Sequence, residues 1–108
     1  TLNTDHMKLL ILTYLKEHAT DVEKICKQAN IYVYSTSDVT GFKNGHEPDM
    51  LEEWFASGTE KFDSMILFSF TDNEKADKGM TLIKKFNKEN QTQFPIKAFI
   101  VPVEKFGS

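Results

Sequence analysis

The sequence predicts an α+β domain in which one antiparallel sheet carries two helices on one face. Three observations lead to this fold class: four short apolar or β-branched runs, two stretches of helical periodicity, and their order along the chain, β-α-β-β-α-β. With 108 residues, 40% of them hydrophobic, the chain can build one core. We expect a single domain over residues 7–106, and residues 1–6 and 107–108 resemble remnants of cloning.

The first strand and the first helix are predicted from neighbouring segments. The run "KLLILTYL", Lys8 to Leu15, is apolar enough to be a buried strand. Thr20 and Asp21 are suited to cap a helix that follows. Its apolar positions recur at the spacing of one helical face and are Val22, Ile25, Cys26 and Ala29. This helix is therefore expected to pack on the sheet.

Two further strands enclose a long connector. The runs "IYVYST", Ile31 to Thr36, and "SMILFSFT", Ser64 to Thr71, are rich in β-branched and aromatic residues. The connector between them, Val39 to Asp63, takes up roughly a quarter of the domain. A connector of that length is unusual in a small domain and indicates a functional segment.

A second helix and a last strand complete the pattern. The segment "TDNE", Thr71 to Glu74, has capping-box spacing. Gly79 weakens the helix that follows. We expect that helix to end around "NKENQTQ", and its apolar stripe comprises Ala76, Met80, Ile83 and Phe86. Pro95 stops any further helix, and "IKAFIVPV", Ile96 to Val103, is predicted to be a strand with Pro102 at an edge or bulge.

This order of elements is typical of the ferredoxin-like arrangement, in which two helices cover one face of a four-stranded antiparallel sheet. The other face is left bare and would carry apolar side chains from all four strands. Because exposed apolar areas of that size usually mark interfaces, we expect self-association through this face.

Charge and cysteine content narrow the possible functions. The net charge of −3 provides no basic stripe, which argues against nucleic-acid binding. No apolar run approaches the roughly 20 residues that span a bilayer, and no secretion signal is visible. Cys26, the only cysteine, excludes an internal disulfide and is expected to be a small core residue. The chain is accordingly predicted to be cytoplasmic.

Two segments resemble the PII family of signalling proteins. "VTGFKNGHE", Val39 to Glu47, is similar to the start of the family's T-loop, and "IKAFIVPVEKF", Ile96 to Phe106, is similar to its last strand. The resemblance covers residues 7–106. It implies a homotrimer whose sheets pack inward, with adenine nucleotides in clefts between subunits. It also implies ligand-binding roles for Gly41, Phe42 and Lys97.

The chain departs from the family pattern at two places. "FPI", Phe94 to Ile96, stands where typical members have a glycine-rich turn, and the arginines that follow Pro-Val-Glu are absent. Glycines allow a phosphate to approach the backbone closely, so these departures argue against ATP binding in the usual manner and favour a weaker or different ligand, such as AMP. The candidate cofactors are ATP, ADP or AMP. The resemblance to divergent PII-like proteins implies signal transduction that regulates a partner, in the first instance a membrane transporter.

The connector has features of a contact surface. "EPDMLEEWFASG" predicts a short amphipathic helix that starts at Pro48 and stops at Gly58. Trp54 and its apolar neighbours either pack against the sheet or a neighbouring subunit, or dock a partner. The candidate partner-binding residues are Lys43, His46, Glu47, Met50, Trp54 and Phe55.

Metal binding and catalysis remain as alternatives. His46, Glu47 and Asp49 are close in sequence, but a divalent metal site needs three or four converging ligands, which a trimer could supply. A metal-binding or metal-tolerance protein similar to CutA is therefore one alternative, although the long connector argues against it. No catalytic motif is visible, so we expect no enzyme. The second alternative to a regulatory protein is a small ferredoxin-like enzyme.

Overall fold

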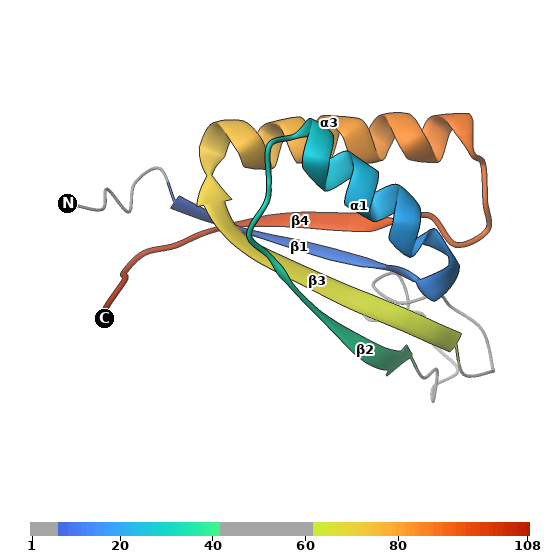
Figure 1. Cartoon of the computed structure of the whole chain (residues 1–108), viewed down its shortest axis with the longest axis horizontal. Helices are drawn as coiled ribbons and strands as arrows, with labels where there is room; N and C mark the ends of the chain where they lie inside the picture. Colours follow the sequence, from blue (N-terminus) through green and yellow to red (C-terminus); the bar gives the residue numbers. More distant parts are fainter. Residues whose placement is uncertain (1–6, 42–61) are drawn as a thin grey trace, which may run out of the picture.

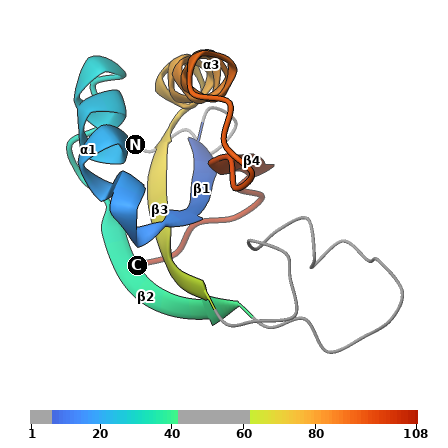
Figure 2. The same cartoon turned by 90° about the vertical axis from the view of Figure 1, so that its right-hand side faces the viewer.

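The computed structural model describes residues 7–41 and 62–108. These residues form one four-stranded antiparallel sheet in the order β2-β3-β1-β4. Helices α1 and α3 lie side by side on one face of this sheet, and no helix of the described residues covers the other face (Figures 1 and 2). The predicted fold class, a ferredoxin-like α+β domain, is confirmed.

The two longest strands occupy the middle of the sheet. Strand β1 (Met7–Leu15) pairs on one side with β3 (Phe62–Asp72) and on the other with β4 (Lys97–Pro102). Strand β2 (Ser35–Gly41) pairs with β3 and forms the opposite edge. Because β1 is central, its side chains are covered on both flanks, which fits its dense apolar sequence.

The core lies between the sheet and the helices. Leu10, Leu12 and Tyr14 alternate along β1 toward the helices and are at most 5% exposed. Helix α1 (Ala19–Gln28) buries Val22, Ile25 and Cys26, and helix α3 (Asn73–Glu89) buries Ala76 and Ile83. The expected apolar stripes and the expected core position of Cys26 are confirmed.

The two helices start differently from the prediction. Helix α1 begins at Ala19, directly after a 3-10 turn (Lys16–His18), so Thr20 and Asp21 lie inside its first turn and do not precede it. Asp72, not Thr71, caps α3, because β3 extends through Asp72 and pairs Thr71 with Lys8. The Asp72 carboxylate accepts a hydrogen bond from the Lys75 amide at 2.8 Å.

Gly79 lies on the buried side of α3. A Cβ atom placed there would meet Leu10 Cδ2 at 3.4 Å and Ile31 Cδ1 at 3.5 Å. The glycine thus lies where α3 is close to both β1 and the segment that follows α1. These distances are ordinary van der Waals contacts, so the site has room for a methyl group.

The predicted strand Ile31 to Thr36 is largely wrong. Asn30 takes a left-handed conformation, with φ of 60°, and the Ile31 amide bonds back to the Cys26 carbonyl at 2.8 Å. Ile31 is buried, whereas Tyr32 and Val33 are exposed, and the strand begins only at Ser35. The chain needs these residues to cross from the helix layer down to the sheet.

The long connector is shorter than predicted, because β2 continues to Gly41 and β3 begins at Phe62. The expected amphipathic helix lies outside the described residues. So do the candidate side chains Phe42, Lys43, His46, Glu47, Asp49, Met50, Trp54 and Phe55. In the described part of the chain, no helix is long and apolar enough to cross a membrane.

Candidate functional site

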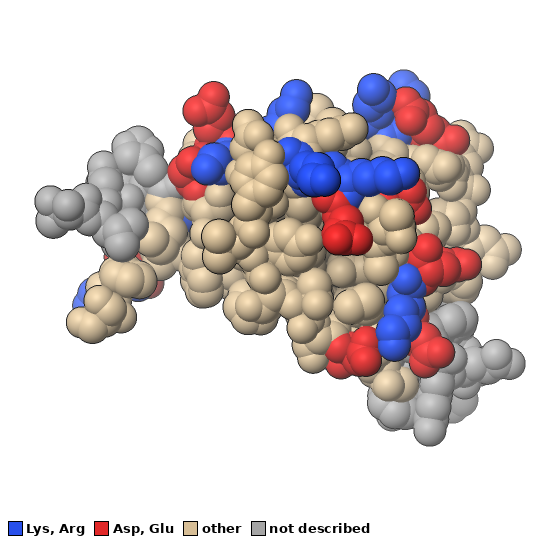
Figure 3. All heavy atoms as spheres, in the orientation of Figure 1, with Lys and Arg blue, Asp and Glu red and all other residues tan. Residues whose placement is uncertain are grey.

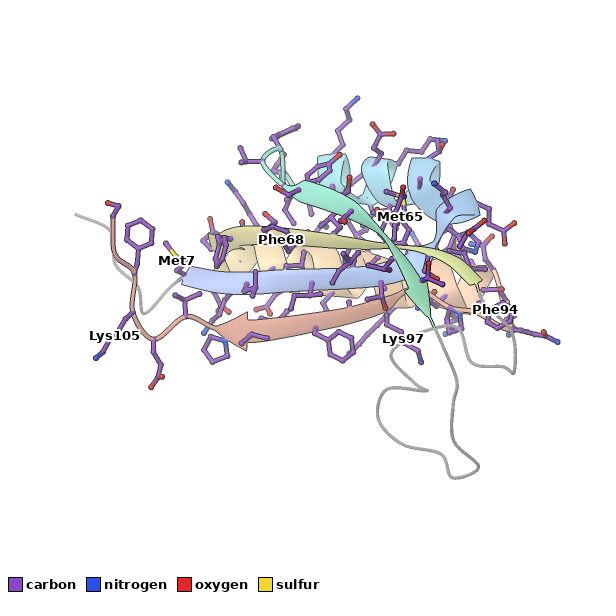
Figure 4. The ribbon with its side chains drawn as sticks, turned by 90° about the horizontal axis from the view of Figure 1, so that it is seen from below. Met7, Met65, Phe68, Phe94, Lys97 and Lys105 are labelled. Atoms are coloured by element: carbon purple, nitrogen blue, oxygen red, sulfur yellow. The ribbon has the colours of Figure 1, made fainter. Side chains whose placement is uncertain are left out.

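The open face of the sheet is the main apolar surface among the described residues. Strand alternation places the half-buried residues Leu9, Ile11, Ile66 and Phe99 on this face, together with three further side chains that are exposed. These are Phe68, Phe70 and Val101, which are 41%, 59% and 41% exposed. Figure 4 views the molecule from this side, with Phe68 in the middle of the sheet. An exposed apolar area across three strands indicates an interface.

The same face becomes polar toward the other end of the sheet. There Thr13 pairs with Ile66 on one side and with Lys97 on the other, and Ser37 also pairs with Ile66. Lys97 therefore lies beside the apolar surface, at the end of the sheet where β2 finishes (Figure 4). A charged side chain so placed can reach the edge of an interface while its aliphatic stem packs on the sheet.

Gly41 and Lys97 share an end of the sheet but lie on opposite edge strands. Gly41 pairs with Phe62 on β3, whereas Lys97 aligns through Thr13 with Ile66, four residues further along. Three strand spacings and four residue rises separate the two positions by about 20 Å. One chain cannot bring both residues to the same small ligand. A ligand that touches both would need two copies of the chain.

The connection from α3 to β4 is held by its own hydrogen bonds. The Asn87 side-chain amide donates to the Ile96 carbonyl at 2.8 Å, and its oxygen accepts from the Ile96 amide at 3.0 Å. The Phe94 amide donates to the Thr92 hydroxyl at 3.1 Å. These two backbone donors are therefore already satisfied. A phosphate at this turn would depend on the Lys97 ammonium rather than on them.

The described residues contain no metal centre. Across 7–41 and 62–108, no three His, Cys, Asp or Glu side chains converge. His18 packs edge-on against Phe86, with ring centroids 5.8 Å apart, and its Nδ1 lies 3.8 Å from an Asp21 oxygen. Cys26 is buried. The other candidate ligands lie in the segment that is not described.

A cleft on the helix side was not foreseen from the sequence. It has a volume of about 200 Å³ and lies between α1 and the strands β1, β3 and β2. Its lining residues are Tyr14, Ala19, Val22, Glu23, Tyr34, Thr36, Met65 and Leu67. Each of these side chains matches an ordinary strand or helix pattern, so no local signal marks the cleft. It exists because the helix and the edge strand diverge.

Ionisable groups around this cleft are held in their neutral forms. Burial, together with the nearby Cys26, Tyr34 and Glu23, raises the pKa of Tyr14 to about 12. Burial and the Glu23 carboxylate raise the pKa of Cys26 to about 11. Burial first, then Cys26 and Glu23, also raise the pKa of Tyr34. At neutral pH the cleft presents tyrosine hydroxyls and not phenolates, and Cys26 is an unreactive thiol.

Comparison with known proteins shows similarity in fold but no family relationship at the level of sequence. The sequence matches no protein-family model, and no curated protein is significantly similar to it. Among solved structures, a PII-like signalling protein from Thermus thermophilus has a TM-score of 0.59 and 11% identity, covering 87% of this chain and 83% of its own.

Two further structures are similar to the same degree. CPII, a nitrogen regulatory PII-like protein from Thiomonas intermedia bound to ADP, AMP and bicarbonate, has a TM-score of 0.59 and 12% identity over 92% of this chain and 93% of its own. A DUF3240 family protein from Shewanella baltica has a TM-score of 0.59 and 16% identity over 99% of this chain and 98% of its own.

The fold and the comparisons together assign a structural class to the protein. The sheet order and the two helices on one face place it among ferredoxin-like α+β proteins. Within that class, the similarity over most of the chain shows a divergent PII-like fold.

Proposed function

We propose that this protein is a PII-like regulatory protein that senses a small ligand at the boundary between subunits and signals to a partner through residues 39–63. The observation that carries the proposal is the open apolar sheet face on a PII-like fold. Regulation by binding requires no catalytic group, so the proposal includes no enzymatic activity.

The first element of the proposal is a homotrimer. Phe68, Phe70 and Val101 expose large apolar areas on a sheet face that no helix covers. Burying this face against copies of itself removes the apolar area from water, which is the usual driving force of obligate assembly. A closed assembly also supplies neighbouring subunits at the sheet edges.

The second element is a ligand site between subunits. Gly41 and Lys97 are too far apart to share a small ligand within one chain, but copies in an assembly can bring one of each together. The proposed ligand is an adenine nucleotide, since the similar CPII structure contains ADP and AMP. AMP or ADP is favoured over ATP, because the turn before Lys97 offers neither glycines nor free Ile96 and Phe94 amides.

The third element is an output segment in the cytoplasm. Residues 39–63 comprise the end of β2, the connection 42–61 and the start of β3, and both strand ends lie at the end of the sheet where Lys97 lies. The proposed contact residues are Lys43, His46, Glu47, Met50, Trp54 and Phe55, whereas Phe42 is proposed to bind the ligand with Gly41 and Lys97. The proposed partner is a membrane transporter. As the alternative to a nucleotide effector, a divalent metal would bind to His46, Glu47 and Asp49.

The decisive experiment combines molar mass with ligand titration. Light scattering should give three times the mass of the chain. AMP or ADP should raise the melting temperature, since a ligand at a hundred times its dissociation constant adds about 2.7 kcal/mol of stability. Lys97→Gln should abolish this shift, whereas Lys84→Gln, an exposed lysine on α3, should leave it unchanged.

The alternatives give different results in the same experiment. A shift with Zn²⁺ and none with nucleotides would favour metal sensing. A monomer that responds to neither would contradict the proposal. For the output segment, Trp54→Ala should weaken capture of the partner and preserve the trimer. Loss of the trimer would instead place Trp54 in an interface between subunits.

A further inference from the structure

The cleft beside α1 continues into a second hollow on the surface. This outer hollow has a volume of about 310 Å³ and is lined by Thr20, Glu23, Lys24, Lys27, Ile31, Tyr32 and Tyr34. Glu23 and Tyr34 line both spaces, so the two are neighbours, and together we call them the groove between α1 and the segment 31–36. The groove lies on the helix side of the sheet, away from the open apolar face.

Tyr14 gives the inner cleft a hydroxyl that has no hydrogen-bond partner among residues 7–41 and 62–108. The residue is only 5% exposed and lines the cleft. Among the described residues, its hydroxyl makes no hydrogen bond, and the only polar side-chain atom that is both buried and unpaired is His18 Nε2. The Tyr14 hydroxyl must therefore reach the open space of the cleft. A hydroxyl that opens into a cleft can donate a hydrogen bond to a ligand and accept one from it.

The size and walls of the inner cleft suit one aromatic ring. Val22, Met65 and Leu67 form apolar walls, and Tyr34 adds an aromatic side chain. A cavity of about 150 Å³ lined by apolar side chains is large enough for benzene. At about 200 Å³, this cleft has room for a ring with one polar substituent. The substituent can exchange a hydrogen bond with Tyr14.

The outer hollow favours an anionic group. Lys24 and Lys27 are three residues apart on α1, so both lie on the same side of the helix. Among the described residues neither lysine has an ion-pair partner, and together they outweigh the single carboxylate of Glu23. Figure 3 shows lysine side chains over the helices, with acidic side chains among them. A carboxylate placed there would meet net positive charge.

We propose that this groove binds a small hydroxyaryl acid, with its ring and hydroxyl against Tyr14 in the inner cleft and its carboxylate at Lys24 and Lys27. The proposal does not depend on the regulatory function above, because it rests on the opposite side of the sheet. It assigns a second ligand site to the fold, formed within one chain.

The test uses 4-hydroxyphenylacetate and phenylacetate, which differ only by the ring hydroxyl. Titrations of the assembled wild-type protein should move the amide resonances of residues 14, 34 and 65, with dissociation constants on the order of millimolar, the scale for about ten non-hydrogen atoms. The hydroxylated acid should bind about three- to tenfold more tightly, which corresponds to one net hydrogen bond. Tyr14→Phe should remove this preference and keep the fold, because it deletes one unpaired hydroxyl.

A second pair of variants tests the carboxylate end. Lys24→Gln combined with Lys27→Gln should weaken both acids and leave the neutral analogue 4-ethylphenol unchanged, whereas Lys84→Gln on α3 should change nothing. Amide shifts that miss the groove, or a hydroxyl preference that persists in Tyr14→Phe, would overturn the proposal. So would tighter binding of the cation tyramine, since that result would make Glu23 the dominant charge.

Discussion

Replacing Phe70 by lysine is predicted to convert the assembled protein into a folded monomer. Phe70 is 59% exposed on the open sheet face, opposite Leu9. A phenylalanine buries about 200 Å² when it is fully covered, so roughly 120 Å² remains for a partner to cover. At about 25 cal/mol per Å², this area contributes ~3 kcal/mol per subunit. In a trimer the loss occurs three times, and each new ammonium group adds the cost of burying a charge.

The assay is light scattering of the wild type and Phe70→Lys over a range of concentrations, with circular dichroism and urea unfolding in parallel. The variant should have the mass of one chain and keep its secondary structure. Tyr32→Lys is the matched control, because Tyr32 is 67% exposed but lies in the groove on the helix side. This control should retain the wild-type mass. A Phe70→Lys protein that also keeps that mass would refute the assignment of the open face as the interface.

Three further predictions concern stability. Gly79→Ala should stabilise the fold by about 0.5–1 kcal/mol in urea unfolding, since helix propensity improves and the new methyl group meets its neighbours at ordinary distances. A loss of stability would show that the site has no room, and Gly79→Val gives the overpacked comparison. Asn87→Ala should cost about 1–3 kcal/mol, because it removes both hydrogen bonds to the Ile96 backbone, and Asn87→Asp, which keeps the acceptor, should cost less. The stability contributed by neutral Cys26 and Tyr14 should be constant up to about pH 9 and fall above it, because the pKa of Cys26 is raised from 9.0 to about 11 and that of Tyr14 from 10.0 to about 12. The unfolded chain loses these protons at lower pH than the folded protein does. The stability due to each neutral group is therefore complete below its unfolded pKa and is lost as pH rises through the folded pKa. The loss is at most about 1.4 kcal/mol per pH unit for each group. Cys26→Ala should delay the fall, and an unchanged profile in that variant would contradict the assignment.

The candidate sites differ in how far the sequence could reveal them. Lys97 and Gly41 were identified by a motif resemblance, and the structure adds that one chain keeps them at opposite edges. The groove beside α1 had no motif, because Tyr14 belongs to an alternating strand and Lys24 to the polar face of a helix. Only the packing of α1 against the sheet brings the two lysines and the two tyrosines to neighbouring hollows.

Local sequence signals were enough to specify most of the elements. β1, α1, α3 and β4 each have an apolar pattern within ten to twenty residues, and those patterns predicted the fold class and most of the core. β2 instead depends on tertiary contacts. Ile31 to Tyr34 have high β-propensity and yet form no strand, whereas the polar segment Ser35–Gly41 does. This segment is a strand because its backbone pairs with β3. The paired residues lie 21 to 33 positions apart in the sequence, from Gly41 with Phe62 to Ser35 with Phe68. Pairing over such separations is set by the whole sheet, and no local preference encodes it.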